Sequence, residues 1–265
     1  MWAAQGEQFR QIVRVAGICG ETSQAVKEAT LSRDLGYQAG LLNVAALRDH
    51  DEQAVVDHCR AVAEVIPVFG FYLNPGIGGR TLPYSFWRRF CEIENVVAIK
   101  IAAFDRYRTI DVVRALAESG RDDISLYTGN DDNIINDLLT PFRFAGKERR
   151  IVGGLLGQWA VWTRRAVETL EEIKRVRNQE TIALEWLAAN AQLTDANAAI
   201  FDAANDFAGC IPGVNEVLRR QGLAPSCRCL DADEILSPGQ SEQLDRVCLE
   251  HPTDNEFVAA NIDRW

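Results

Sequence analysis

One octapeptide, Asn95-Val-Val-Ala-Ile-Lys-Ile-Ala102, constrains the fold of this chain more than any other stretch. It is an almost continuous run of apolar, strand-forming residues, which is typical of a strand buried on both faces of a parallel sheet. A lysine is out of place there, because burying an ammonium group without a partner is costly. Burial lowers the pKa of a lysine and makes its amine a nucleophile toward carbonyl compounds. Alternatively, Lys100 lies at the strand end, where its ammonium group reaches water or pairs with a carboxylate.

The segments around this strand alternate between strand and helix patterns. Apolar runs predict strands over residues 12–18, 39–43, 65–72, 95–102, 124–128 and 150–156. Helical spacing predicts intervening helices over residues 22–35, 51–64, 84–91, 109–119 and 133–139. This alternation implies six parallel strands joined by right-handed helical crossovers.

Beyond Trp159 the sequence predicts helices alone. Their ranges are 159–177, 180–193, 195–207, 212–221 and 237–250, the last with Ser237 as N-cap and Pro238 at the first helical position. We therefore expect an α/β domain over residues 1–158, a helical region over 159–225 and a helical tail over 226–265.

Composition narrows the classes of function. The formal net charge of the 265 residues is −10, without a lysine and arginine cluster, so nucleic acid and anionic membranes are not expected partners. No stretch approaches the length of a membrane span, and Met1 to Gln11 lacks the apolar segment of a signal peptide. Seven scattered cysteines predict reduced thiols in a cytoplasmic protein. Cys227, Cys229, Cys248 and His251 depart from the usual zinc spacing, so we expect no metal and interpret the thiols as small buried hydrophobes.

A tyrosine precedes the lysine by about one strand–helix unit. Tyr72 ends the strand 65–72, and Lys100 follows 28 residues later at the end of the next strand. We therefore expect both side chains at the C-terminal rim of adjacent strands, where barrel active sites lie. A phenol there would give and take the protons of carbinolamine formation and dehydration. Alone, Tyr72 would be interpreted as a strand-end aromatic with a satisfied hydroxyl.

Together these features resemble the dihydrodipicolinate synthase/N-acetylneuraminate lyase family of class I Schiff-base aldolases. The resemblance covers residues 14–225 and rests on Tyr72 with Pro75 three residues on, and on Val-Ala-Ile-Lys100 at the family's spacing. Thr128-Gly-Asn-Asp131 resembles the family's Ser-Gly-Asp-Asp turn, and Gly153-Gly154 resembles its glycine-rich last strand.

The resemblance implies a TIM (βα)8-type barrel, here incomplete with six strands and followed by C-terminal helices. It implies that Lys100 forms an imine with pyruvate or a related small 2-oxo acid, without a cofactor, for aldol condensation or retro-aldol cleavage. Tyr72 would then transfer protons, and the protein would be a homo-oligomer. Substrate-binding positions implied in this way are Thr128, Asn130 and Gly154, together with the loop residues Gly78, Gly79 and Arg80.

The chain departs from the family pattern in three places. Ile77 stands where the family has its carboxylate-binding arginine. Arg80, helped by the NH groups of Gly78 and Gly79, would replace that arginine, or else it is an ordinary surface residue. The segment 43–46 lacks the family's proton-relay tyrosine.

The third departure concerns the beginning of the barrel. Alignment backward from Tyr72 makes residues 12–18 the family's third strand, so its first two βα units are missing. Gly20-Glu21-Thr22 is then a strand-to-helix turn with a cap, rather than the family's hydroxyl-bearing loop.

Six strands do not close an eight-stranded barrel, and a truncated barrel exposes two sheet edges. We therefore carry two hypotheses: a lyase that acts through a Lys100 imine, and a catalytically inactive or truncated member that acts as a binding or assembly subunit. A phosphate-binding barrel enzyme with a structural Lys100 has less support. Asp131 and Asp132 are candidate ligands for a metal or a substrate hydroxyl, although a helix N-terminus favours carboxylates in any case.

Overall fold

A six-stranded parallel sheet organises the chain, of which the computed structural model describes residues 12–264. The sheet has the order β1-β2-β3-β4-β5-β8, and every neighbouring pair is parallel. Its strands are β1 (Val15–Ile18), β2 (Ala39–Leu42), β3 (Val68–Leu73), β4 (Val96–Ala102), β5 (Ser125–Thr128) and β8 (Ile151–Gly154). The intervening helices are α1 (Thr22–Asp34), α2 (Glu52–Ala63), α3 (Tyr84–Cys91), α4 (Arg106–Ser119) and α5 (Ile134–Leu139). This arrangement confirms the predicted α/β fold with six parallel strands.

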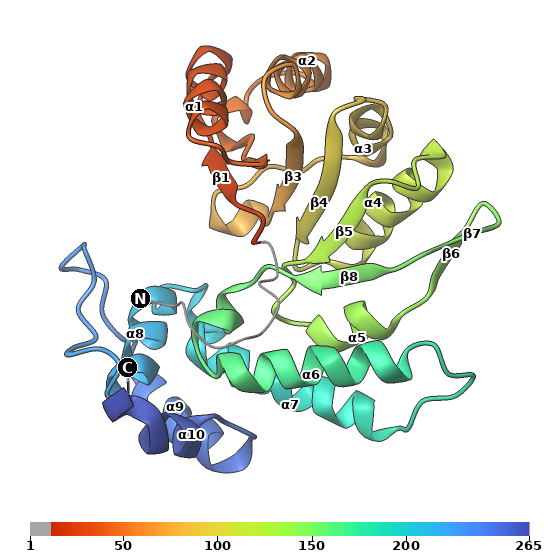
Figure 1. Ribbon diagram of the computed structural model, residues 1–265. Helices are drawn as coiled ribbons and strands as arrows, with labels where there is room; N and C mark the ends of the chain where they lie inside the picture. Colours follow the sequence, from red (N-terminus) through yellow and green to blue (C-terminus); the bar gives the residue numbers. More distant parts are fainter. Residues whose placement is uncertain (1–11, 265) are drawn as a thin grey trace.

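The sheet curves like part of a barrel but does not close. Figure 1 shows the strands as a fan, with α1 to α4 along its outer side and α5 near β8. Within residues 12–264, β1 and β8 are the two edge strands, and neither pairs with a further strand of the sheet. The outer side holds the main core, in which Trp87, Phe90 and Ile99 are almost fully buried. The opposite, concave side is only partly covered, and Val15 remains more than a third exposed there.

Side-chain caps and glycines set the limits of several helices. The Asp51 carboxylate accepts a hydrogen bond from the Ala54 NH (2.8 Å) and begins α2. Asp105 caps α4 in the same way through the Arg108 NH (3.0 Å). Gly120 ends α4 with φ +79°, a conformation that glycine adopts without steric cost. The predicted cap of α1 is wrong, because Glu21 occupies the N-cap without a side-chain bond and the Thr22 hydroxyl contacts His58 instead.

A short hairpin between α5 and β8 was not predicted. Strands β6 (Phe142–Phe144) and β7 (Lys147–Arg149) pair antiparallel around Ala145 and Gly146, both with positive φ. Two consecutive residues of positive φ are the requirement of a tight hairpin turn. It could not be read from local pattern, because each strand has only three residues and lacks an extended apolar alternation. The predicted first strand was also too long: β1 begins at Val15, and Ile12 is 83% exposed.

The C-terminal part is helical, as predicted, with different boundaries. Its helices are α6 (Thr163–Val176), α7 (Glu185–Ile200), α8 (Cys210–Arg220), α9 (Gln240–Glu250) and α10 (Asn255–Asn261). The separate helices predicted over 180–193 and 195–207 are wrong, because α7 runs through Asp195, whose carboxylate binds Arg246 instead of capping a helix. Ser237 is also not an N-cap. Gly239, with φ +83°, precedes α9, and the Ser237 hydroxyl donates to the Asp202 carboxylate (2.5 Å).

A second, smaller core lies among these C-terminal helices. It is built from Trp162, Ile200, Val217, Leu244 and Val247. Helices α6 and α7 also contribute side chains to the main core, so the helical region packs directly on the sheet domain. The predicted domain boundaries stay a prediction.

The structure bears on two predictions made from composition, those about membrane spans and about cysteines. In residues 12–264 no helix is both long and apolar enough to cross a bilayer. All seven cysteines carry free thiols. The segment Met1 to Gln11, interpreted above as lacking a signal peptide, lies outside the described residues.

Candidate active site

Lys100 lies near the C-terminal end of β4, and its side chain faces the concave side of the sheet. Its register partners are Phe71 on β3 and Tyr127 on β5. Partnered residues of parallel strands project from the same face, so these three side chains share the concave side. The Lys100 ammonium nitrogen lies 4.4 Å from the centroid of the Phe71 ring. An apolar ring therefore contacts the amine directly.

Gly129 makes room for the lysine side chain. A Cβ atom at this position would lie 2.8 Å from Lys100 Cε and 2.7 Å from Ala102 Cβ. The Gly129 NH also donates to the Ile101 carbonyl (2.6 Å), which holds the loop after β5 against β4. Glycine at residue 129 therefore leaves room for the Lys100 side chain to cross the loop that follows β5.

Burial and one acidic neighbour set the protonation of Lys100. Burial lowers the pKa of Lys100, and the Asp131 carboxyl group opposes this effect. Burial also raises the pKa of Asp131 to about 7, against the Gln158 NH and the Lys100 charge, which lower it. Burial therefore favours the uncharged form of both groups. Such an environment is typical of a nucleophilic amine rather than of a solvated surface lysine.

Tyr72 does not lie beside Lys100, and this expectation from the sequence is wrong. Its register partner is Ile101, so its side chain projects from the outer side of the sheet. There the ring is fully buried against Trp87 of α3, with ring centroids 5.3 Å apart. Its hydroxyl accepts a hydrogen bond from the Leu82 NH (3.3 Å). Tyr72 is a core tyrosine with a satisfied hydroxyl, and the concave position is held by Phe71.

Thr128 and Asn130 are also turned away from the lysine, into a buried polar network. The Thr128 hydroxyl and the Asn130 amide both donate to the Asp137 carboxylate of α5 (2.6 and 3.0 Å). The Asn130 side-chain oxygen accepts from the Phe104 NH (2.9 Å). Both residues have no exposed surface. Their contacts hold the strand ends on α5 and leave no free group for a substrate, contrary to the expectation from the family turn.

The loop after β3 uses its polar groups internally. The Arg80 guanidinium donates to the carbonyls of Leu47 and His50 (3.1 Å for His50), tying this loop to the one after β2. The Gly79 NH donates to the Asn74 carbonyl (3.0 Å), and a Cβ at Gly79 would meet the Leu73 carbonyl. The Gly78 carbonyl accepts from Arg48 (3.5 Å). Arg80 and Gly79 are therefore already engaged, and the proposed carboxylate site of Gly78, Gly79 and Arg80 is not formed here.

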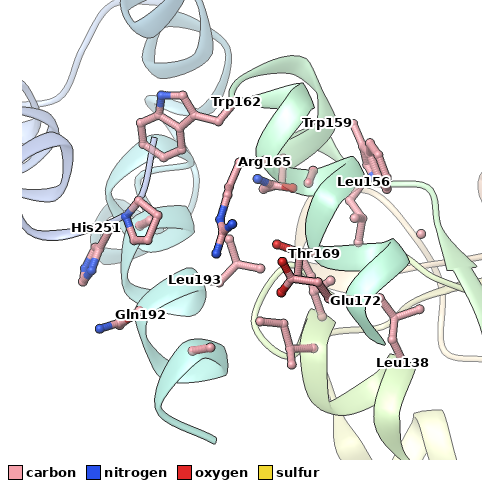
Figure 2. A pocket seen from close by; sticks show the side chains of 18 of the residues that line it. Leu138, Leu156, Trp159, Trp162, Arg165, Thr169, Glu172, Gln192, Leu193 and His251 are labelled. Atoms are coloured by element: carbon pink, nitrogen blue, oxygen red, sulfur yellow. The ribbon is translucent and has the colours of Figure 1, made fainter. Parts of the chain in front are cut away.

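Gly154 lines a separate cavity in the helical layer. This cavity, partly open to solvent, lies between α5, α6 and α7. Figure 2 shows Arg165, Thr169 and Glu172 of α6 projecting into it, with Trp159 and Trp162 near its rim. Lys100 is not among its lining residues. Gly154 thus belongs to the outer side of β8, away from the amine.

The C-terminal cysteines and His251 are not gathered into a ligand cluster. His251 contacts the Asp195 carboxylate (2.6 Å), while Cys229 lies against Asn215. Over residues 12–264, the grouping with metal-ligand spacing is Asp195, Glu250 and His251. Arg246 forms ion pairs with both carboxylates of this group (2.7 and 2.9 Å), so a cation already neutralises it.

The contact at Gly129 gives a first prediction. We expect Gly129→Ala to lower the free energy of unfolding by about 1–3 kcal/mol, because the new methyl group overpacks against Lys100 and Ala102. Urea unfolding followed by circular dichroism measures this loss. Gly17→Ala is the control for the fold, because a Cβ there meets no atom within 4 Å and the residue does not have a positive φ. A Gly129 variant as stable as the wild type would contradict the contact.

Comparisons with known proteins add the family. A model of the dihydrodipicolinate synthetase family matches residues 7–142, just over half of the chain. The chain belongs to this family. Two curated relatives are named 4-hydroxy-tetrahydrodipicolinate synthase. The one from Acaryochloris marina is 30% identical over 112 residues, which are 42% of this chain and 37% of the relative. The one from Clostridium novyi is 26% identical over 128 residues, 48% of this chain and 42% of the relative.

The chain thus spans less than half the length of these curated relatives. Solved structures agree on the fold. The dihydrodipicolinate synthase from Acinetobacter baumannii, complexed with pyruvate, has a TM-score of 0.68 at 20% identity over 89% of this chain and 74% of its own. The enzyme from Bacteroides thetaiotaomicron has the same TM-score and coverages at 12% identity.

Sequence reasoning missed Phe71 and undervalued Asp131. For Phe71, the signal was the neighbouring Gly70. A Cβ atom at Gly70 would lie 2.7 Å from the Phe90 ring of α3, so this aromatic helix packs on the side of the strand to which Gly70 belongs. Because side chains alternate along a strand, Tyr72 follows Gly70 to that face and Phe71 takes the other. For Asp131, the signal was its place in the family turn, one residue after Asn130. Its contacts come from Gln158 and from Asn197 of α7, far along the chain, which no local pattern reveals.

Proposed function

We propose that this protein is a lyase of the aldolase type that forms a Schiff base between Lys100 and pyruvate or a related small 2-oxo acid. The observation that carries the proposal is the half-buried Lys100 amine, with its lowered pKa, on the concave side of the sheet near the C-terminal strand ends. Family membership supports it, and the related enzyme from Acinetobacter baumannii was solved with pyruvate. Oligomeric state and a cytoplasmic location remain predictions from the sequence.

The chemistry begins with the neutral amine. Its lone pair attacks the C2 carbonyl carbon of the 2-oxo acid, the carbonyl π pair moves to the oxygen, and a proton passes from the nitrogen to that oxygen to give a neutral carbinolamine. Loss of this hydroxyl as water leaves a protonated imine. The imine withdraws electrons from C3, so a C3 proton or a C3–C4 bond is lost to form an enamine. The phenol of Tyr72, on the far side of the sheet, takes no part in these steps.

Borohydride trapping tests the proposal. The wild-type protein is incubated with pyruvate and sodium borohydride, and the reduced adduct is located by peptide mass mapping. The chain has four lysines, at 27, 100, 147 and 174, so the assignment is simple. We expect an adduct at Lys100 alone. Lactate, which lacks the 2-oxo group, is the control. No adduct, or equal labelling of the exposed Lys27 and Lys174, would sink the lyase proposal.

The open sheet favours a second candidate, a catalytically inactive member that acts as a binding or assembly subunit. The strands β1 and β8 present unpaired edges within residues 12–264, and such edges recruit further strands. This candidate predicts no adduct at Lys100 and stable self-association or partner binding in analytical ultracentrifugation. A Lys100 adduct on a monomeric protein would exclude it.

A further inference from the structure

The Lys100 amine has an apolar ring where a phenol was expected, so the proposed reaction needs another group to move protons. Phe71 cannot donate or accept one. We propose that the Asp131 carboxyl group is the proton-transfer group of the Lys100 site. This inference rests on the Schiff-base function proposed above and assigns a group that the resemblance did not.

The loop after β5 places Asp131 near the amine. The Lys100 side chain crosses this loop at Gly129, two residues before Asp131. The Asp131 carbonyl accepts a hydrogen bond from the Asn197 amide of α7 (2.9 Å), and its carboxylate accepts a long one from the Gln158 NH (3.4 Å). The residue is therefore held from two sides, while its carboxylate keeps most of its hydrogen-bonding capacity.

Asp131 and Lys100 interact through their charges but form no direct ion pair. The Asp131 carboxyl group is therefore not tied to the amine by a salt bridge and is free to interact with a molecule bound at Lys100. The other titratable groups that act on Asp131 or respond to it are Asp132 on its own loop and the Cys210 thiol of α8. No arginine pairs with Asp131 in the described part of the chain, so its carboxylate is not locked in the charged form by a structural ion pair.

Tyr127 is the competing candidate on the concave side, and its geometry is less suitable. Its ring packs against Phe69, with centroids 5.2 Å apart, whereas the Lys100 amine lies against Phe71. Phe69 is two residues nearer the N-terminal end of β3 than Phe71. The Tyr127 ring thus points toward the N-terminal ends of the strands, away from the loop after β5 that carries Asp131.

One carboxyl group is sufficient for both proton transfers of imine and enamine formation. Protonated Asp131 donates its proton to the carbinolamine hydroxyl, which leaves as water and yields the protonated imine. The Asp131 carboxylate then takes a proton from C3, the C–H electron pair forms the enamine C=C bond, and Asp131 is protonated again. No oxidant, reductant or further co-reactant enters. The same group acts as acid and then as base, which is efficient when its pKa is close to the working pH.

Deuterium incorporation into the pyruvate methyl group, followed by proton NMR in D2O, tests this assignment. We expect Asp131→Asn to slow the exchange by about 100-fold or more, as loss of a general acid–base group does. The Lys100 adduct should still be trapped by borohydride, although more slowly. Asp111→Asn is the control: it changes a carboxylate of α4 that pairs with Arg114 at the surface (3.0 Å), and it should exchange at the wild-type rate. Asp131→Glu, which keeps the carboxyl group, should restore part of the exchange.

The pH profile of the exchange rate gives a second readout. The reactive form holds one proton between Lys100 and Asp131, so the wild-type exchange rate should be bell-shaped in pH, and Asp131→Asn should lose one limb. A wild-type profile with a single limb, wild-type exchange in Asp131→Asn, or loss of exchange in Tyr127→Phe alone would each overturn the role of Asp131. Absence of any wild-type Lys100 adduct would instead overturn the Schiff-base function itself.

Discussion

Lys100→Met is expected to abolish the pyruvate adduct and, at neutral pH, to make the protein more stable. The adduct is lost because methionine has no nucleophilic nitrogen. Stability rises because the folded state pays to bury the Lys100 ammonium, as its lowered pKa shows, whereas methionine fills a similar volume without charge. Replacing buried charged groups by hydrophobic ones of similar size commonly gains about 1–4 kcal/mol. We expect a gain at the lower end, because Asp131 then loses its counter-charge and takes up a proton.

The sign of the pH dependence follows from the direction of the shift. The pKa of Lys100 is lower in the folded state than in the unfolded chain, so the unfolded state binds the proton more tightly. The resulting penalty is absent above the unfolded pKa of about 10.4 and grows as the pH falls toward the folded value. The stability gain of Lys100→Met should therefore shrink as the pH rises from 7 to 10. Urea unfolding of both proteins at each pH measures this difference.

Lys147→Met is the matched control for this prediction. Lys147 lies on the hairpin, half-buried, in an ion pair with Asp122 (3.3 Å). Surface pairs of this kind contribute about 0–1 kcal/mol, so its removal should leave the protein equally stable or slightly weaker. The Lys100 adduct should form normally in this variant. If Lys100→Met destabilises the fold while Lys147→Met does not, the amine of Lys100 is a structural group with a good partner, and the functional interpretation fails.

The sequence predicted the sheet because each strand is specified by local pattern. The run around Lys100, the apolar runs before it and the run 124–128 coincide closely with the strands β1 to β5, and the alternation with helices required parallel pairing. Lys100 itself could be singled out because a lysine in a buried strand conflicts with its surroundings, and such conflicts mark functional sites. The structure places it on the concave side, as a reactive amine requires.

The rest of the site depended on information that local pattern does not contain. Which face Tyr72 occupies is decided by the packing of Trp87 and Phe90 on β3, an interaction between neighbouring elements. The engagement of Arg80 is decided by carbonyls on another loop, some thirty residues earlier. The continuity of α7 through Asp195 depends on Arg246, fifty-one residues later. Residue identity indicated the chemistry, but tertiary contacts decided which residues remained free to perform it.

Asp137→Ala is expected to cause the largest loss of stability in the described part of the chain. The Asp137 carboxylate is fully buried and accepts hydrogen bonds from the Thr128 hydroxyl, the Asn130 amide and the Arg106 guanidinium. Alanine would leave these donors without their partner inside the protein. A buried donor left without its partner costs about 1–3 kcal/mol, and the Thr128 hydroxyl and the Asn130 amide are both buried. The Arg106 side chain is 42% exposed and can turn to water. We therefore expect a total loss of about 2–4 kcal/mol, a large share of the stability of an ordinary domain.

The control for Asp137 is Asp111→Ala, which removes a carboxylate from α4 that pairs with Arg114 at the surface (3.0 Å). We expect a loss of about 0–1 kcal/mol in that variant, measured by urea unfolding beside Asp137→Ala. The two variants differ in function as well. Because Asn130 directly precedes Asp131, release of Asn130 should disorder the loop that carries the proposed proton-transfer group, so Asp137→Ala should also slow C3 exchange. Equal losses of stability in both variants would show that the buried network does not hold the strand ends in place, and would leave the position of Asp131 without its structural cause.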